Sequence, residues 1–171
     1  MLTIAVFPNI DKENAPMVLR RIVNFYQGKD VKLLMPMDSA KFFRYEEYGV
    51  DDIENYPIDM ALSIGGDGTL LGICRRLYER DIPVCGINIG TFGFLADIEL
   101  PELESKLEKI IKGQYYFEER MLVSGFVKSG EDDERFLGHA INDVVVTKGG
   151  VARMLHLGLS VDGCRVMDYK A

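Results

Sequence analysis

The chain has 171 residues, of which 20 are lysine or arginine and 27 are aspartate or glutamate, giving a formal net charge of −7. This acidity argues against a surface that coats nucleic acid or anionic lipid, although a local basic pocket is compatible with it. Apolar residues make up 47% and charged residues 27%, which excludes a disordered chain. No apolar run approaches the ~20 residues of a membrane helix, and the three cysteines form no CxxC pair. We expect a cytoplasmic protein with no nucleic-acid partner and no membrane partner.

The first hundred residues alternate short apolar runs with stretches of helical periodicity. The apolar runs predict strands at residues 3–7, 31–35, 60–64 and 83–87. Stripes with three- and four-residue spacing predict helices over residues 15–26 and 70–78. Residues 42–57 fit neither period and are acidic, so we expect a solvated segment there. Strands that alternate with helices imply a parallel sheet covered on both faces.

The pattern changes after Pro101. An amphipathic helix is predicted over residues 103–111, and short strand-like runs follow it. These runs lie at residues 115–117, 121–127, 140–147, 155–161 and 164–169. Turn signals separate them at residues 129–133 and at Asp162-Gly163, which is a strong two-residue hairpin signal. This part of the chain is therefore predicted to be antiparallel β.

Two domains follow from this change of pattern. We expect an N-terminal α/β domain with a parallel sheet over residues 1–100, and the start of a mainly antiparallel β domain over residues 101–171. The sequence stops at Ala171, directly after a predicted strand and with no closing element. We therefore expect the second domain to be incomplete.

A glycine-rich turn, GGDGT at residues 65–69, joins the third predicted strand to the second predicted helix. Glycines permit positive φ and let a ligand approach the backbone closely, and the amides at a helix N-terminus form a cradle for an anion such as phosphate. The alternative is a tight turn in which Asp67 or Thr69 caps the helix. Three glycines in four positions favour the phosphate site. The turn is neither a Walker-type loop nor the dinucleotide fingerprint, because the spacings differ.

Two further motifs carry polar or aromatic side chains. A second glycine loop, NIGTFGFL at residues 88–95, follows the next predicted strand, and loops at neighbouring carboxyl ends of a parallel sheet share one crevice. Phe94 in this loop is either a stacking surface for a base or a core residue. The pair Asn142-Asp143 either grips ribose hydroxyls or forms a strand-end turn. His139 and His156 have no second metal-type ligand nearby and are interpreted as structural.

Together, GGDGT, the NxGxxGFL loop and the later Asn-Asp pair resemble the NAD kinase family, in which they occur in this order at similar separations. The resemblance covers residues 1–171. GGDGT alone is shared with diacylglycerol- and sphingosine-type lipid kinases and, loosely, with phosphofructokinases. The resemblance implies a phosphofructokinase-like α/β domain, a β domain, an active site in the cleft between them, and homo-oligomers. It also implies transfer of a phosphoryl group from ATP or polyphosphate to the 2′-hydroxyl of the adenosine ribose of NAD, which gives NADP.

The resemblance also implies roles for individual residues. Asp67 would orient or deprotonate the attacking hydroxyl, and Gly68 would line the same pocket. The donor phosphates would approach Gly65 and Gly66. The dinucleotide would be contacted by Phe94, Asn142, Asp143, Arg153 and Lys170. Of these, Arg153 and Lys170 are the nearest sources of positive charge for phosphate.

The expected mechanism depends on positioning. Phosphoryl transfer passes through a loose transition state, so Asp67 would hold the hydroxyl in line more than act as a strong base. A magnesium ion (Mg²⁺) would bridge the donor phosphates, and the sequence shows no dedicated protein cage for it.

Two other functions stay open at this point. Family members continue with an Asp-Gly turn and a glycine- and threonine-rich strand that binds both substrates, and neither follows Lys170-Ala171 here. We therefore expect a fragment or a truncated form, which could be a non-catalytic dinucleotide-binding module. A lipid kinase of the diacylglycerol kinase type could use the same glycine turn. It would need an apolar acceptor pocket or a membrane-facing patch, and no basic amphipathic segment of that kind is present.

Overall fold

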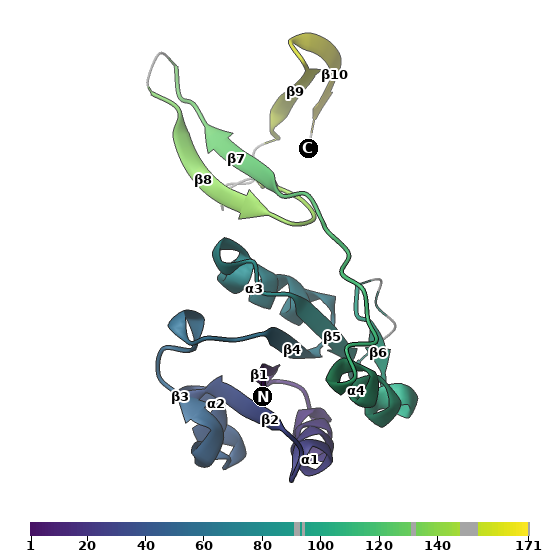
Figure 1. Ribbon diagram of the computed structural model, residues 1–171. Helices are drawn as coiled ribbons and strands as arrows, with labels where there is room; N and C mark the ends of the chain where they lie inside the picture. Colours follow the sequence, from purple (N-terminus) through teal and green to yellow (C-terminus); the bar gives the residue numbers. More distant parts are fainter. Residues whose placement is uncertain (91–92, 94, 131–132, 148–153, 171) are drawn as a thin grey trace.

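The computed structural model describes residues 1–90, 93, 95–130, 133–147 and 154–170. Its first part is a six-stranded sheet in the order β3-β2-β1-β4-β5-β6, and every neighbouring pair is parallel (Figure 1). The strands are β1 (Leu2–Pro8), β2 (Val31–Pro36), β3 (Gly49–Val50), β4 (Met60–Gly65), β5 (Val84–Asn88) and β6 (Ile98–Glu99). The predicted α/β fold class is confirmed.

Helices cover both faces of this sheet because its strands alternate apolar side chains between the two faces. The helices are α1 (Ala15–Tyr26), α2 (Met37–Phe43), α3 (Asp67–Leu77) and α4 (Leu103–Ile111). In β1, Ile4 and Val6 pack in one core with α1 and α4. Ala5 and Phe7 belong to a second core, which contains Ile73 and Leu77 of α3.

The order in which strands are added to the sheet changes direction between β1 and β4. From β1 it proceeds outward to β2 and β3, and it then returns to the other side of β1 and proceeds outward through β4, β5 and β6. As a result, α1 and α3 start from the adjacent ends of β1 and β4 and pack on opposite faces of the sheet. In open parallel sheets such a switch point leaves a crevice at the carboxyl ends of the strands, where ligands bind.

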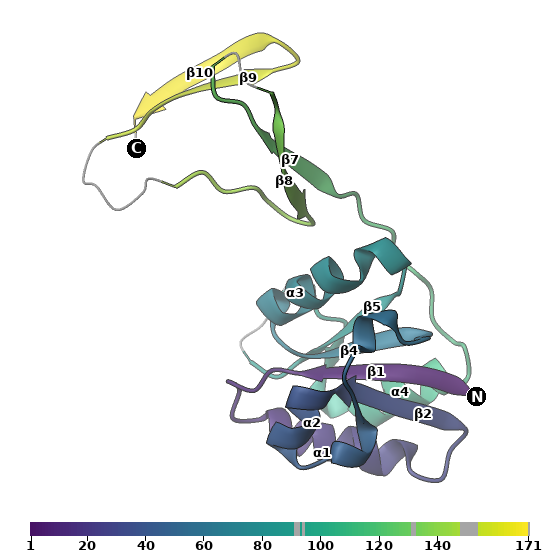
Figure 2. The same ribbon diagram turned by 90° about the vertical axis from the view of Figure 1, so that its left-hand side faces the viewer.

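Two antiparallel hairpins follow α4 (Figure 2). One pairs β7 (Val123–Val127) with β8 (Arg135–Ala140), and the other pairs β9 (His156–Val161) with β10 (Cys164–Lys170). The second hairpin turns at Asp162 and Gly163, whose φ angles of 50° and 78° lie in the left-handed region that this turn requires. The hairpin predicted at this dipeptide is therefore confirmed.

The structure corrects the prediction for residues 42–57. This segment contains two 3-10 turns, η1 (Glu46–Tyr48) and η2 (Ile53–Asn55), with the edge strand β3 between them. Ile53 is only 1% exposed and packs in the α3-side core. A single buried side chain leaves no periodic signal, so the sequence pattern of this acidic segment predicts solvation and does not reveal the burial of Ile53.

The strand predicted at residues 140–147 is also wrong. Pairing with β7 ends where Val123 meets Ala140, and residues 141–147 form a bend and an extended segment outside any strand. The valines at residues 144–146 suggested a strand, but they are 50–71% exposed and have no strand partner. Residues 115–117 likewise lie outside any strand. Within the described ranges, no helix is long and apolar enough to cross a bilayer.

Candidate functional site

The glycine turn at residues 65–69 lies at the switch point, where it is tied to the end of β1. The side chain of Asn9 donates from Nδ2 to Thr69 Oγ1 at 2.9 Å, across 60 positions of sequence. The backbone N–H of Asn9 donates to the carbonyl of Ile64 at 2.9 Å. Its Oδ1 accepts from the backbone N–H of Asp11 at 2.9 Å and so shapes the loop before α1. Asn9 therefore fixes the β1–α1 loop against the start of α3.

The three positions of the turn are occupied by glycine for different structural reasons. Glycine permits positive φ, but none of the three has it. Gly66 is extended (φ −119°, ψ −170°) and leads straight into α3. A Cβ on Gly65 would lie 2.2 Å from Thr69 Oγ1, so packing requires this glycine. A Cβ on Gly66 or on Gly68 would meet no heavy atom of the described residues within 4 Å. These two glycines leave open space beside the backbone, as a ligand-binding turn would.

Asp67 is the first residue of α3 and directly follows the N-cap residue Gly66. Its Oδ1 accepts a hydrogen bond from the backbone N–H of Leu95 at 3.1 Å. A Cβ on Gly93 would lie 2.4 Å from the same Oδ1, so the second glycine loop passes directly over the carboxylate. The two glycine loops thus meet at Asp67.

The second glycine loop starts from a buried polar residue at the end of β5. Asn88 is 3% exposed, donates from Nδ2 to Glu99 Oε1 at 3.0 Å, and accepts at Oδ1 from the backbone N–H of Gly90 at 3.1 Å. These bonds fix the direction in which the loop leaves the sheet. A carboxamide can do this because it both donates and accepts.

A cavity of about 240 Å³ lies between α3 and the segment that follows β8. Gly68, Leu71 and Arg75 line it from α3, and residues 139–143 line it from the other side. The structure therefore brings the predicted site residues Gly68, Asn142 and Asp143 to one cavity. Asn142 lies in the bend at residues 141–142, and its Nδ2 donates to Oδ1 of the next residue, Asp143, at 3.2 Å.

An aromatic contact holds the hairpin against α3 beside this cavity. The rings of Tyr78 and His139 meet edge to face with their centroids 5.2 Å apart. His139 Nδ1 also lies 3.0 Å from Ser124 Oγ on the paired strand. His139 thus contacts Tyr78 at the end of α3 and Ser124 in its own hairpin.

The remaining predicted residues lie elsewhere. Lys170 ends β10 and lines a separate hollow of about 540 Å³ in the β9–β10 hairpin, together with His156 and Arg165. Figures 1 and 2 both show this hairpin separated from α3 by the β7–β8 hairpin. Phe94 and Arg153 lie outside the described residues.

Sequence reasoning missed two cations near the site. The Nζ of Lys12 lies 3.9 Å from the point that a Cβ on Gly90 would occupy, beside the second glycine loop. Arg75 lines the 240 Å³ cavity. Within the described part of the chain, neither forms an ion pair. Arg75 follows Gly68 by seven positions, and this two-turn spacing is a signal that could have placed it on the same helix face.

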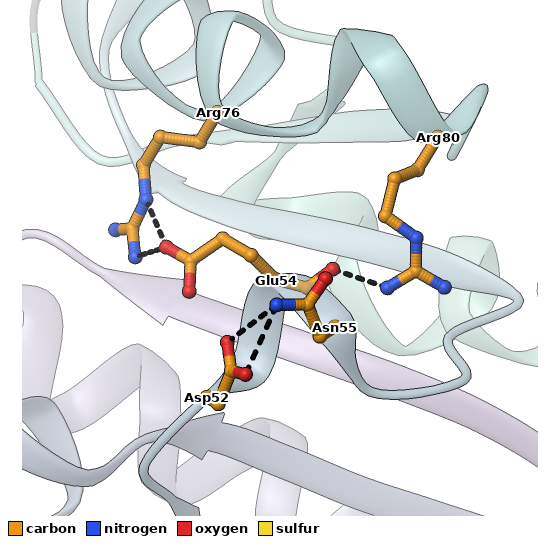
Figure 3. Close-up of polar contacts among 5 residues, drawn as sticks. All are labelled: Asp52, Glu54, Asn55, Arg76 and Arg80. Atoms are coloured by element: carbon orange, nitrogen blue, oxygen red, sulfur yellow. Dashed lines mark hydrogen bonds and ion pairs between the residues drawn. The ribbon is translucent and has the colours of Figure 1, made fainter.

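Arginines at the far end of α3 and just after it contact residues of η2 and the segment that follows it (Figure 3). Arg76 donates from Nε to Glu54 Oε1 at 2.9 Å, and this bond lowers the pKa of the Glu54 carboxyl. Arg80 donates to the backbone carbonyls of Glu54 and, at 3.0 Å, of Tyr56. The neighbouring residues Arg75 and Arg76 therefore have different contacts, since Arg75 lines the cavity and Arg76 binds Glu54.

Comparison with known proteins gives the family. The model of the ATP-NAD kinase N-terminal domain matches residues 3–115. The chain is 36% identical to the NAD kinase of Moorella thermoacetica over 171 residues and 32% identical to that of Syntrophotalea carbinolica over 174 residues. Each alignment covers 100% of this chain, but 54% and 60% of those proteins.

A solved structure supports the fold. The chain is similar to the crystal structure of yeast NADH kinase complexed with NADH, with a TM-score of 0.80 and 18% identity over 98% of this chain and 55% of that one. The chain thus spans a little over half the length of the relatives that it matches. Because the family model matches most of its residues, the chain belongs to the ATP-NAD kinase family.

Proposed function

We propose that this protein is an NAD kinase, which transfers a phosphoryl group from ATP or polyphosphate to the 2′-hydroxyl of the adenosine ribose of NAD and gives NADP. One observation carries the proposal. The carboxylate of Asp67 is held by the N–H of Leu95 where the two glycine loops meet, one residue before Gly68 enters the cavity that Asn142 and Asp143 also line. Membership of the ATP-NAD kinase family supports this assignment.

On the acceptor side, Asp67 accepts a hydrogen bond from the 2′-hydroxyl and holds its oxygen in line with the donor phosphorus. Asp67 orients the hydroxyl more than it deprotonates it, because phosphoryl transfer passes through a loose transition state that depends on positioning. Asn142 and Asp143 offer amide and carboxylate groups to the dinucleotide. Phe94, Arg153 and Lys170 are proposed as further contacts with it on the family resemblance alone.

On the donor side, Gly66 leaves open space beside the backbone and leads into the first turn of α3, where helix amides attract phosphate. Gly65, which packs against Thr69, is proposed as a further contact with the donor phosphates on the family resemblance alone. Lys12 supplies positive charge from the neighbouring loop. Mg²⁺, when bound with the donor, neutralises phosphate charge. No cluster of three metal-type side chains occurs among the described residues, so we propose that phosphates and water hold the ion.

We also propose the larger organisation of the protein. Residues 1–100 form the α/β domain and residues 101–171 begin the β domain, with α4 as the segment of the second that packs on the first sheet. The protein assembles as a homo-oligomer, for which exposed apolar side chains such as Phe126 and Phe136 offer contact area. A cytoplasmic location agrees with the three cysteines, all of which are free.

The test offers NAD and diacylglycerol side by side with labelled ATP. We expect the label in NADP, and label only in lipid would overturn the proposal. NAD binding without any transfer would identify a non-catalytic binding module instead. Asp67→Asn should retain the fold and NAD affinity and lose turnover by roughly 10²-fold or more. Near-full turnover in this variant would remove Asp67 from the mechanism.

A further inference from the structure

We propose that Arg75 binds the diphosphate of the dinucleotide from the α3 wall of the 240 Å³ cavity, an inference that rests on the proposed function. Arg75 lines this cavity together with Gly68 and Asn142. Gly68 directly follows Asp67, the residue assigned to the ribose hydroxyl. The cavity therefore extends from the proposed reacting end of the acceptor to the arginine.

Helix geometry gives the arginine the required reach. Arg75 follows Asp67 by eight positions, which corresponds to about 12 Å along α3. Side chains on a helix point back toward its N-terminus, and Arg75 lines the cavity together with Leu71, which is one turn nearer to Asp67. This places the arginine on the wall along which a ligand with its ribose held at Asp67 would extend. In NAD the diphosphate lies next to that ribose along the molecule.

Charge is the second argument. The chain carries a net charge of −7, so an anionic ligand needs a local cation to enter the cavity. The described charged or titratable side chains that line it are Arg75, His139 and Asp143. His139 Nδ1 lies 3.0 Å from Ser124 Oγ, and Asp143 Oδ1 accepts from Asn142. A guanidinium matches phosphate oxygens with two parallel hydrogen bonds, which an ammonium or imidazole does not.

The neighbouring arginine provides a matched control on the same helix. Arg76, about 100° further around the helix, is bound to Glu54 (Figure 3). It also lies over the ring of Phe7, with 5.4 Å between its Cζ and the ring centroid. Arg75→Gln and Arg76→Gln therefore remove the same charge from adjacent positions, and only the first changes the cavity. This pair separates a ligand contact from a general effect of net charge.

The test measures binding of NAD and of adenosine to the protein by calorimetry. Arg75→Gln should weaken NAD binding tenfold or more, as expected for losing hydrogen bonds to a charged group, and leave adenosine binding and the melting temperature unchanged. Arg75→Lys should bind NAD with intermediate affinity, and Arg76→Gln should bind it as the unmodified protein does. If Arg75→Gln binds NAD as tightly as the unmodified protein, or loses as much affinity for adenosine as for NAD, the inference about Arg75 is wrong. The proposed function would not be affected by either result. Absence of NAD binding to the unmodified protein would overturn the proposed function as well.

Discussion

Replacing Gly93 by alanine is expected to lower turnover about 100-fold while the fold is retained. A Cβ at this position would lie 2.4 Å from Asp67 Oδ1 and 3.0 Å from Asp67 Cγ, whereas ordinary contacts begin at 3.4 Å. The carboxylate must therefore move by about 1 Å, and a misplacement of this size costs on the order of 10² in rate. The same movement disturbs the 3.1 Å bond from Leu95. Because the clash is with the end of a side chain, rotation of Asp67 relieves it at small cost to stability.

The assay is the initial rate of NADP formation at saturating NAD and ATP, with circular dichroism and thermal unfolding as checks of the fold. Gly90→Ala is the control in the same loop, because a Cβ there would approach only Lys12 Nζ, at 3.9 Å. This variant should retain its turnover. Turnover of Gly93→Ala within twofold of the unmodified protein would refute the positioning of Asp67, and loss of its fold would refute the argument that rotation relieves the clash.

Two further predictions concern the turn and an ion pair. Gly65→Ala should destabilise the protein by about 1–3 kcal/mol in urea unfolding, since its Cβ would lie 2.5 Å from Thr69 Cβ. The Cβ in Gly66→Ala would enter open space, so this variant should keep its stability but lose affinity for ATP in calorimetry. Loss of stability in Gly66→Ala together with loss of ATP affinity in Gly65→Ala would contradict the packing role of Gly65 and the binding role of Gly66. Arg21, whose Nη2 lies 2.6 Å from Glu104 Oε2, lowers the pKa of that carboxyl, so the pair stabilises the fold above the ordinary pKa and is lost as pH falls through the lowered value. Glu104→Gln should therefore cost about 0.5 kcal/mol at neutral pH and nothing in strong acid, and an equal cost in urea unfolding at both pH values would contradict this.

The elements with strong periodicity were predicted within one to three residues at each end. The stripe over residues 15–26 coincides with α1, and the runs at residues 3–7 and 60–64 are extended in β1 and β4 by one or two residues. Such patterns are reliable here because each of these elements has at least one fully buried face. The position of GGDGT at the end of a buried strand followed directly.

Features that depend on tertiary contacts could not be predicted in this way. Residues 144–146 have the composition of a strand, but a strand also needs a partner, and the register of β7 with β8 ends at Ala140. The close contact between Gly65 and Thr69, which explains one glycine of the turn, is likewise not visible in the sequence. Lys12 stands 53 positions before Gly65 in the sequence. The pairing of β1 with β4 and the Asn9–Thr69 bond, both tertiary contacts, bring its loop to the turn.

Charge explains why the proposed site needs both cations that the sequence left unassigned. The reaction joins two anionic molecules next to the carboxylate of Asp67, in a chain whose net charge is −7. Phosphate groups held close to each other and to a carboxylate repel unless cations lie between or beside them. Lys12 lies by the loop over Asp67 and Arg75 lies on the cavity side of α3, and neither is engaged in an ion pair within the described ranges. If each serves one substrate, Lys12→Gln should weaken ATP binding alone and Arg75→Gln should weaken NAD binding alone, so a loss of both ligands in either variant would refute this division.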